Sequence, residues 1–443
     1  MIKSNLRTVS YEKPLKVTLL SLGWYRRKDP RTPLGMAYIY AGLKNHFSEG
    51  ESIEVFFVES DIRGNISNVI HKILVENPDV LGIGVYAWNS ETVKSVLNSL
   101  RSLGYTGTIV LGGPEITYGS VELNDEFQHV QYFVKGFGEG AFADIVKSVI
   151  YNKEIVSPGV YKRGDVIGNA LADPMIDFNS SPFSREELFS RITGDNFIRW
   201  QTQRGCVFRC SFCAFKMPNE RVANSDLETV RLELEKINKI GVKNVAVLDP
   251  IFFINQERSI RILDLIGQIT PDVNFNIQSR FEHLDSKIIE KISSLKITLE
   301  CGLQTMDENV QRKIKRLNNR EKVIASINSL HAHNVRFETH LIYGLPGQTI
   351  KSFLSDMRFL TDMRCNIVRI FPLSRLRGTE IDVESSENDM IFSPIFPREI
   401  IQTRWMNREE VLKLKNAQIN LEDRNGHLNE AFLNVIKREV DVI

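Results

Sequence analysis

The N-terminal third of the chain alternates between short apolar runs and amphipathic segments. Val, Ile, Leu and Phe dominate the runs at 15–22, 52–60, 80–88, 107–113 and 130–136, and helix-like segments separate them. Near-continuous apolar runs indicate strands that are buried on both faces, and strands alternating with helices predict a parallel, doubly wound sheet. We therefore expect residues 1–150 to form a Rossmann-like α/β domain whose ligand lies beyond the carboxyl ends of its strands.

A second alternating series begins after a less regular, turn-rich segment at 151–192, which we interpret as a linker. Its strand-like runs are 197–203, 244–249, 275–279, 297–304, 337–346 and 367–373. Helical segments separate them, including a single long helix after the fourth run. Because six units are too few for a closed eightfold barrel, residues 193–380 are predicted to form a partial (β/α)6 barrel. A short, mostly helical C-terminal region is expected over 381–443, with a terminal helix at 408–440.

Composition narrows the class of protein. The chain of 443 residues has 56 Lys and Arg against 55 Asp and Glu, so no overall field favours nucleic acid or an anionic membrane as a partner. We find no apolar run of transmembrane length, and the first residues lack the apolar stretch of a secretory signal. Five cysteines, three of them clustered, suit a reducing compartment better than a disulfide framework. We expect a soluble, cytoplasmic protein.

The clustered cysteines are Cys206, Cys210 and Cys213, spaced C-x3-C-x2-C in the stretch RGCVFRCSFCAF. They follow the first barrel strand directly, at the face where barrel active sites form. Structural zinc normally takes four protein ligands, and no further Cys or His lies near this loop. A cubane iron–sulfur cluster has four irons, so three thiolates leave one iron open to another ligand. Zinc with a distant fourth ligand, or three buried cysteines without metal, are the alternatives.

This motif, its position and Phe212 before the last cysteine resemble the radical S-adenosylmethionine (AdoMet) enzymes. In that family AdoMet chelates the open iron through its amino and carboxylate groups. One electron from the cluster then cleaves the sulfonium to give a 5′-deoxyadenosyl radical. The resemblance implies that the three cysteines hold a [4Fe-4S] cluster. It also implies that the protein binds AdoMet and takes electrons from an external donor such as flavodoxin or ferredoxin.

Residues further along the barrel resemble the AdoMet contacts of that family. Asp249 follows strand two, where the family binds the AdoMet amino group, but the usual Gly-Gly-Glu is absent and backbone carbonyls are expected to serve instead. The segment from Glu300 to Gln304 resembles the strand-four signature in which Gln contacts the ribose. Twelve residues later, Arg316 matches the spacing of an Arg that pairs with the AdoMet carboxylate in the coproporphyrinogen-oxidase-like branch.

Two further barrel residues match the family less closely. His340 begins the stretch HLIYGLPG, which resembles the strand-five motif near the adenine, although His stands where Asp is common. Gln278, on strand three, lies near the place where many relatives carry Glu. Taken alone, the glycines and proline of the strand-five stretch could simply shape a turn. The order and spacing of the motifs argue against that simple interpretation, and the resemblance implies that Gln278 and His340 contribute to AdoMet binding.

A parallel sheet before a radical barrel resembles the cobalamin-binding subgroup of these enzymes. The stretches PLGMAYIYAGLK, VYAWN, GGPEITYG and GEGAF look like its recurring loops. The resemblance implies that cobalamin is bound by Tyr86, Trp88, Gly112, Gly113, Glu115 and Gly138. The Asp-x-His-x-x-Gly motif is absent, so no protein imidazole is expected on the lower face, and Tyr86 or Trp88 is placed to cover it. Alternatively, Trp88 is a core aromatic, or the domain has lost its corrin.

The resemblance implies a cobalamin-dependent radical AdoMet enzyme that methylates an unactivated carbon of a natural-product or peptide substrate, with methylcobalamin as methyl donor. The alternative enzyme catalyses cyclisation, oxidation or epimerisation without methyl transfer. Cys301 or Cys365 as a hydrogen donor would favour epimerisation, although both are more simply buried small hydrophobes. A redox-sensing or corrinoid-binding protein without turnover is the non-enzymatic hypothesis. We assign no catalytic side chain and expect neither membrane nor nucleic acid as a partner.

Overall fold

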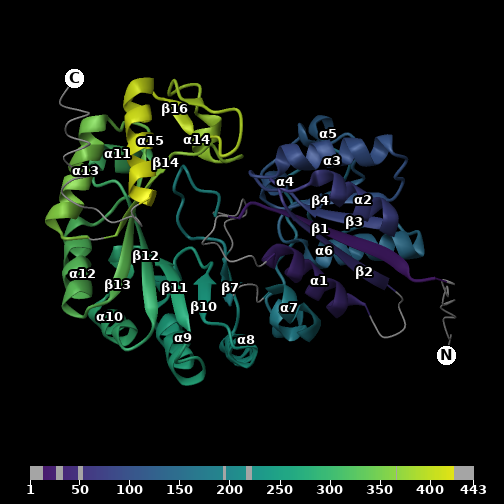
Figure 1. Ribbon diagram of the computed structural model, residues 1–443, viewed down its shortest axis with the longest axis horizontal. Coiled ribbons are helices and arrows are strands. Elements are labelled where there is room, and N and C mark those ends of the chain that lie inside the picture. Colours follow the sequence, from purple (N-terminus) through teal and green to yellow (C-terminus); the bar gives the residue numbers. More distant parts are fainter. Residues whose placement is uncertain are drawn as a thin grey trace. The chain divides into compact units, whose positions relative to one another are not determined.

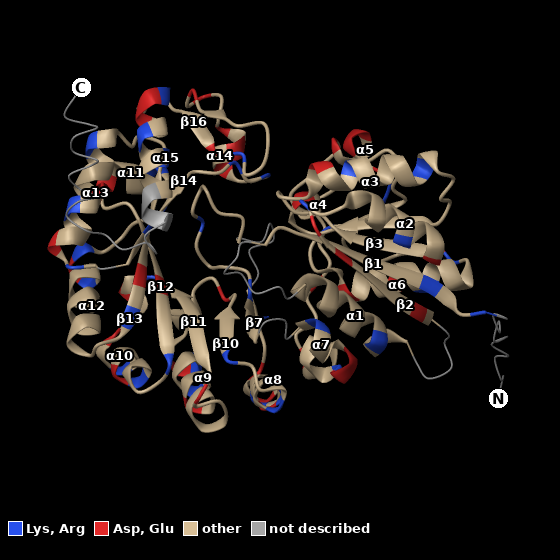
Figure 2. Cartoon of the chain, viewed as in Figure 1, with Lys and Arg blue, Asp and Glu red and all other residues tan. Residues whose placement is uncertain are grey.

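The computed structural model describes residues 13–25, 33–47, 53–192, 196–215, 222–365 and 367–423. The chain divides into two compact units, residues 1–192 and residues 193–443 (Figure 1). Each unit is built around its own six-stranded sheet. Lys and Arg are interspersed with Asp and Glu on the helices of both units, in agreement with the balanced charge of the sequence (Figure 2).

The sheet of the first unit has the order β2-β1-β3-β4-β5-β6. Strands β1 to β5 run parallel, and β6 pairs antiparallel with β5. The chain leaves β1 toward β2 and then returns to the other side of β1 with β3, so the strand order reverses between β1 and β3. In open α/β sheets such a switch point is where ligands bind. The strands are β1 (Leu15–Gly23), β2 (Ile53–Asp61), β3 (Val80–Gly84), β4 (Thr108–Gly112), β5 (Tyr132–Val134) and β6 (Val160–Lys162).

Helices cover both faces of this sheet, as a doubly wound arrangement requires (Figure 1). Helices α2 and α3 pack on one face, where Ile73 and Val96 join a core cluster with Leu81. On the other face α1 packs against α6. The helices are α1 (Leu34–His46), α2 (Ile66–Glu76), α3 (Ser90–Ser102), α4 (Pro114–Thr117), α5 (Leu123–Glu126) and α6 (Gly138–Tyr151). Residues 151–192 complete the unit with β6, the short turns η1 (Phe178–Ser180), η2 (Pro182–Ser184) and η3 (Glu186–Leu188), and α7 (Phe189–Ile192).

The second unit contains an all-parallel sheet of order β14-β13-β12-β11-β10-β7, which is the predicted series of six barrel strands. Burial alternates strictly along β12, so one face packs on helices and the other faces the barrel interior. The strands are β7 (Phe197–Trp200), β10 (Asn244–Val247), β11 (Asn274–Ser279), β12 (Ile297–Gln304), β13 (Arg336–Tyr343) and β14 (Val368–Pro372). The α/β fold class is confirmed.

Side-chain caps fix the helices between these strands. Asp226 caps α8 by accepting from the Thr229 amide (2.6 Å), and Thr349 and Ser352 form a capping box at α13. The helices are α8 (Leu227–Ile240), α9 (Gln256–Ile269), α10 (Ser286–Ser293), α11 (Glu308–Lys313), α12 (Arg320–Ala332) and α13 (Ile350–Asp362). A short pair, β8 (Gln203–Arg204) and β9 (Ala223–Asn224), flanks the cysteine loop, and the turns η4 (Phe252–Ile254) and η5 (Phe281–His283) follow β10 and β11.

The expected single long helix after β12 is wrong. The structure has α11 and α12, separated by residues 314–319. Lys315 there adopts a left-handed backbone with φ of 52°, and Asn319 starts α12 afresh by accepting from the Lys322 amide (2.9 Å). Apolar residues recur through the break, at Ile314 and Leu317, so the sequence pattern gave no sign that the helix ends there. The break matters because it turns Arg316 toward the cysteine loop.

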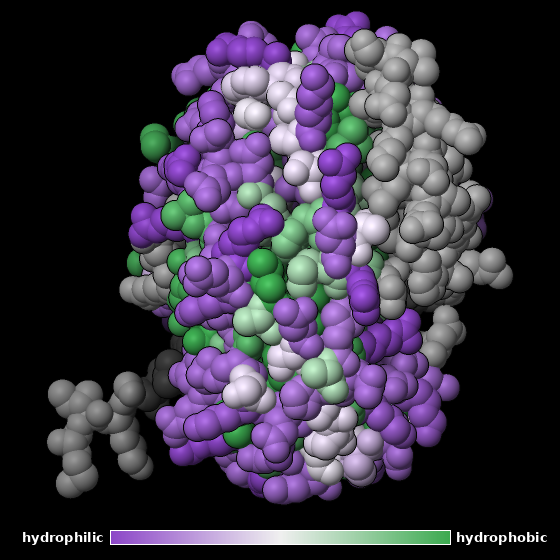
Figure 3. Space-filling model, turned by 90° about the vertical axis from the view of Figure 1, so that its left-hand side faces the viewer, coloured by the Kyte–Doolittle hydropathy of each residue, from purple (hydrophilic) through white to green (hydrophobic). Residues whose placement is uncertain are grey.

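The C-terminal region is less purely helical than expected. It contains α14 (Glu380–Val383), an antiparallel pair of β15 (Ile391–Phe392) and β16 (Ile400–Gln402), and α15 (Arg408–Asp423). The remainder of the helix predicted at 408–440 lies outside the described residues. Among the described helices, none has both the length and the apolar character needed to cross a bilayer. The face shown in Figure 3 carries mainly hydrophilic residues, with hydrophobic ones between them.

Candidate functional site

A buried carboxylate fixes the start of the cysteine loop. Asp249, after β10, is 1% exposed and accepts hydrogen bonds from the Thr202 amide (2.7 Å), the Thr202 hydroxyl (2.5 Å) and the Gln203 amide (2.9 Å). Burial raises the pKa of Asp249, while these bonds and the Arg258 charge oppose the rise. Since the carboxylate is occupied by the loop, any contact of this segment with AdoMet stays a prediction for its backbone carbonyls.

The three cysteines are free thiols in this loop. Cys210 is buried, whereas Cys206 and Cys213 are half-buried. The loop folds back on itself through the Cys213 amide and the Cys210 carbonyl (3.1 Å), and the Ser211 amide binds the Ile314 carbonyl at the end of α11 (3.0 Å). Burial raises the pKa of Cys206, and that of Cys213 to about 11. Thiols of this kind become thiolates beside positive charge, which the irons of a cluster would provide; that these three cysteines hold a cluster stays a prediction.

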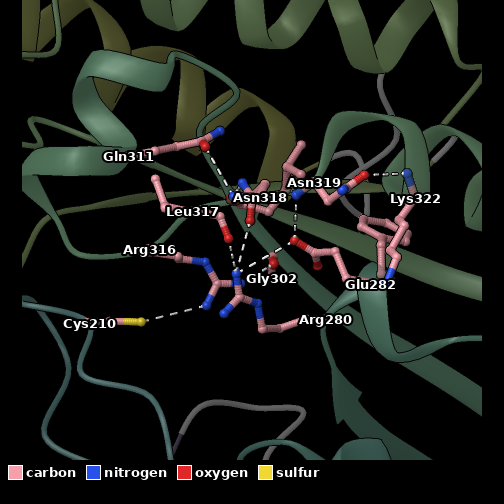
Figure 4. A network of polar contacts seen from close by, with 12 residues as sticks. Cys210, Arg280, Glu282, Gly302, Gln311, Arg316, Leu317, Asn318, Asn319 and Lys322 are labelled. Carbon is pink, nitrogen blue, oxygen red and sulfur yellow. Dashed lines mark hydrogen bonds and ion pairs between the residues drawn. The ribbon is translucent and has the colours of Figure 1, made fainter.

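Arg316 connects this loop to the end of β12. Its side chain is buried; Nη1 lies 3.8 Å from the Cys210 sulfur, and Nη2 hydrogen bonds to the Gly302 carbonyl (Figure 4). Gln304 ends β12 with φ of 68°. A Cβ atom at Gly302 would lie 2.6 Å from Gln304 Nε2, so glycine leaves the space that Gln304 occupies.

Among the buried polar atoms near the loop that lack partners in the described residues are Gln304 Oε1 and Arg316 Nε. Buried polar groups are normally hydrogen-bonded, so these atoms indicate a polar ligand at this place. An acceptor for the Arg316 guanidinium and a donor for the Gln304 carbonyl are what a carboxylate and a ribose hydroxyl offer. The residues present therefore fit AdoMet.

A second arginine, which the sequence analysis did not single out, completes the network. Arg280 follows β11, is 4% exposed, and donates from Nη2 to the Leu317 carbonyl (2.6 Å) and to Asn318 Oδ1 (3.3 Å) (Figure 4). It also pairs with Glu282 at 3.5 Å. The backbone amide of Asn318 donates in turn to Gln311 Oε1 (3.0 Å). These bonds hold the break between α11 and α12.

The inner face of the sheet continues the polar surface below Gln304. Gln278 lies beside Glu300 in register, with Nε2 and Oε2 3.5 Å apart. His340 Nε2 lies 3.8 Å from Glu338, which also pairs with Arg369. Burial alone would raise the pKa of Glu338, but His340 and Arg369 lower it to about 2. The predicted AdoMet residues thus fall into two groups. Arg316 and Gln304 lie near the cysteine loop, whereas Gln278, Glu300 and His340 lie on the inner face of the sheet, and the cofactor role of this second group stays a prediction.

In the first unit, the aromatic pair predicted for cobalamin lies at the switch point. Tyr86 and Trp88 stack with ring centroids 4.4 Å apart and planes 8° apart. Trp88 Nε1 donates to the Leu22 carbonyl (3.1 Å), which joins the carboxyl ends of β1 and β3. Asn89, fully buried, donates to the Leu22 and Gly84 carbonyls (3.0 and 2.9 Å). Because both rings are half-buried, they form a surface at the strand ends and not part of the core.

The remaining residues predicted to bind cobalamin differ in backbone conformation and burial. Gly113 has φ of 94°, and a Cβ there would lie 2.6 Å from the Val85 carbonyl oxygen, so the turn itself requires glycine. Gly112 has ordinary space around it. Glu115 is 4% exposed and its amide approaches the Val85 carbonyl (3.2 Å), while Gly138 begins α6. Their contacts with a corrin stay predictions.

The two other cysteines face away from the barrel interior. Cys301 is fully buried on the helix-packed face of β12, and Cys365 is 2% exposed before β14. Burial raises the pKa of Cys301 well above that of an ordinary thiol. These positions agree with small core residues and give no support to a hydrogen-donating thiol for epimerisation.

Comparison with known proteins identifies both units. Residues 200–360 match the model of the Radical SAM superfamily, and residues 27–146 match the model of the B12 binding domain. SAM is S-adenosylmethionine. The two matches fall on the units that carry the cysteine loop and the aromatic pair, respectively.

Several relatives align over much of the chain. Uncharacterized methyltransferase PH0819 of Pyrococcus horikoshii is 21% identical over 87% of this chain and 83% of its own length. Cobalamin-dependent radical SAM methyltransferase TokK of Streptomyces tokunonensis is 24% identical over 69% of this chain and 49% of its own length. Ribosomal protein uS12 methylthiotransferase RimO of Pseudothermotoga lettingae is 24% identical over 43% of this chain and 47% of its own length.

Two solved structures share the fold. The radical SAM methyltransferase TsrM from Kitasatospora setae superposes with a TM-score of 0.68 at 15% identity, covering 84% of this chain and 76% of that chain. The cobalamin-dependent radical enzyme OxsB does so with a TM-score of 0.72 at 13% identity, covering 97% and 71%. With a B12 binding domain and a Radical SAM domain in one chain, the protein belongs to the cobalamin-binding-domain radical SAM enzymes.

Proposed function

We propose that this enzyme methylates an unactivated carbon of a natural-product or peptide substrate. The observation that carries the proposal is that Arg316 contacts both Cys210 and Gly302, next to a Gln304 side-chain carbonyl that has no partner among the described residues. The methyltransferase names of TokK and TsrM, and the matching B12 binding domain, support methyl transfer as the outcome.

When bound, the cluster and cobalamin supply one-electron cleavage of AdoMet and a transferable methyl group. The chain's own contribution is to place these groups. In the proposal Cys206, Cys210 and Cys213 hold the cluster, Arg316 pairs with the AdoMet carboxylate, and Gln304 binds the ribose. Tyr86 and Trp88 cover the lower face of the corrin, where an aromatic surface offers no imidazole ligand. Substrate radicals require a site that excludes water.

The experiment follows the fate of AdoMet in anaerobically reconstituted protein supplied with cobalamin and titanium(III) citrate. Methylation predicts 5′-deoxyadenosine together with at least one equivalent of S-adenosylhomocysteine per bound cobalamin. With deuterated-methyl AdoMet and a converted substrate, the product gains the labelled methyl group. Persistent 5′-deoxyadenosine without S-adenosylhomocysteine would reject methylation and favour cyclisation or oxidation. Absence of both would favour a protein that binds these cofactors without turnover.

A methylthio transfer is the second candidate, because RimO aligns with 43% of this chain. It would attach sulfur as well as a methyl group, so the product mass separates it from methylation directly. We further propose that the enzyme works in the cytoplasm with a flavodoxin or ferredoxin as electron donor, since clustered thiols and a reduced cluster require a reducing environment.

A further inference from the structure

We propose that Arg280 is a positioning residue for the cysteine loop and sets the midpoint potential of the cluster that the loop holds. The inference rests on the proposed function in one respect, namely that Cys206, Cys210 and Cys213 bind a [4Fe-4S] cluster. It assigns a role to a buried cation that the AdoMet contacts leave unexplained.

The first observation is a clamp on the loop. Phe208 lies between Cys206 and Cys210 in the sequence, and its half-buried ring sits under Arg280, with the guanidinium carbon 4.4 Å from the ring centroid. The ring of His283 lies near the same phenylalanine, with centroids 5.7 Å apart. A guanidinium over an aromatic face attracts it electrostatically, and the attraction is stronger away from water. Arg280 therefore holds the first half of the loop against the end of β11.

The second observation is that Arg280 is itself held rigidly. Only 4% of the residue is exposed, and Nη2 donates to both the Leu317 carbonyl (2.6 Å) and Asn318 Oδ1 (3.3 Å). The same segment carries Arg316, which reaches Cys210 (Figure 4). One guanidinium therefore fixes the cysteine loop and the α11–α12 break relative to each other. The Nε atom of Arg280 is buried and has no hydrogen-bond partner among the described residues.

The third observation concerns charge. Arg316 is engaged by the Gly302 carbonyl and the predicted AdoMet carboxylate, so Arg280 is the second buried cation beside the thiols. Glu282 lies 3.5 Å from Arg280 and offsets part of its charge, and its carboxylate also accepts from the Asn319 amide (3.2 Å). Arg280 and Glu282 are thus a cation and an anion near the thiols whose charges can be removed separately.

Reduction of the cluster adds one electron, supplied by a low-potential one-electron donor, and involves no bond to Arg280. A fixed positive charge favours the more negative reduced cluster, and net charge near a cluster is one of the factors that set its potential. Removing the Arg280 charge should therefore lower the equilibrium constant for reduction by about tenfold, which is about 59 mV for one electron. Removing the Glu282 charge should raise it.

The experiment is an anaerobic redox titration of the reconstituted full chain, followed by the electron paramagnetic resonance signal of the reduced cluster. Four variants are compared with the wild type. Arg280→Gln removes the cation, Arg280→Lys keeps the charge without the planar fork, and Glu282→Gln removes the anion while keeping an acceptor. Arg261→Gln, on α9 and paired with Glu257, is the matched control because that side chain is 60% exposed.

We expect a lower potential in Arg280→Gln, a higher one in Glu282→Gln, and values close to wild type in Arg280→Lys and Arg261→Gln. A purely structural role would give shifts of one sign, or none, and would overturn the charge assignment. Phe208→Leu tests the clamp with all charges kept; we expect less iron and sulfide retained on gel filtration, and full retention would contradict the clamp. If Arg280→Gln binds no cluster, Glu282→Gln still decides the sign. Failure of the wild type to bind a cluster would instead reject the proposed function.

Discussion

Replacing Asp249 by alanine should release the start of the cysteine loop without touching a cysteine. The carboxylate is the acceptor for the amides of Thr202 and Gln203 and for the Thr202 hydroxyl, at 2.7, 2.9 and 2.5 Å. Alanine leaves these donors buried and unpaired. An unsatisfied buried donor costs about 1–3 kcal/mol, so the two amides together lose about 2–6 kcal/mol of local stability.

Hydrogen exchange measured by mass spectrometry on peptides covering 200–210 reports this loss locally. A loss of about 2 kcal/mol corresponds to roughly 30-fold faster exchange, and larger losses to more. Asp249→Asn is the matched control, because its carbonyl oxygen can accept from both amides while its NH2 donates to the Thr202 hydroxyl. We expect exchange in that variant to stay within about fivefold of the wild type. Iron content after reconstitution should fall in Asp249→Ala and be largely kept in Asp249→Asn.

Unchanged exchange at 202–203 in Asp249→Ala would refute the reasoning, because it would mean that the carboxylate does not hold the loop. Equal losses in both variants would also count against it, since the hydrogen bonds and not the charge are taken to matter. Peptides from the first unit serve as an internal reference, because the hydrogen bonds of this carboxylate go to Thr202 and Gln203 in the second unit.

Three further predictions concern Arg316, Asp356 and Trp88. Arg316→Lys keeps a charge near Cys210 but loses the planar pair of donors, so equilibrium dialysis should show AdoMet binding at least about tenfold weaker; unchanged affinity would exclude the carboxylate contact. Burial raises the pKa of Asp356 from 3.8 to about 7, and its carboxylate binds the Thr305 hydroxyl and the Met306 amide at 2.7 Å each. Because the folded state holds this proton more tightly, the contribution to stability is full below pH 4 and is lost as the pH rises from 4 to 7, with a slope of at most about 1.4 kcal/mol per pH unit. Thermal unfolding of Asp356→Asn should lack that component, and an identical pH profile in both proteins would contradict the assignment. Trp88→Ala should lower the cobalamin retained after gel filtration, as judged by its visible absorbance, while iron content stays the same; equal retention would remove Trp88 from the corrin site.

The sequence predicted the fold well because the spacing of apolar residues and the length of each apolar run distinguish strands from helices. Near-continuous apolar runs marked the inner strands of the first sheet, and β12 was found with its observed bounds, Ile297–Gln304. The break between α11 and α12 was missed because it depends on side chains that bind across the fold. Arg280, which follows β11, donates hydrogen bonds to Leu317 and Asn318, and no local sequence pattern predicts a contact between residues so far apart in the chain.

The candidate site was predictable in part for the same reason. Cysteine spacing predicted three cluster ligands, and the structure brings Arg316, which the motif spacing singled out, within 3.8 Å of one of them, Cys210. The burial of the Asp249 carboxylate against the loop could not be foreseen, because its partners lie 46 and 47 residues away. Arg280 carried one usable signal, since it stands directly after a strand whose carboxyl end faces the thiols. An arginine at that position could have been predicted to lie near the cysteine thiols.

The most direct test of the central claim is formation of 5′-deoxyadenosine by reduced, reconstituted wild type and by Cys210→Ala. If three thiolates hold a cluster whose remaining iron binds AdoMet, the wild type will cleave AdoMet and the variant, with one ligand removed from the buried side of the loop, will not. Cleavage at the wild-type rate in Cys210→Ala would contradict the account. So would a wild type that carries four irons and four sulfides per chain and leaves AdoMet intact.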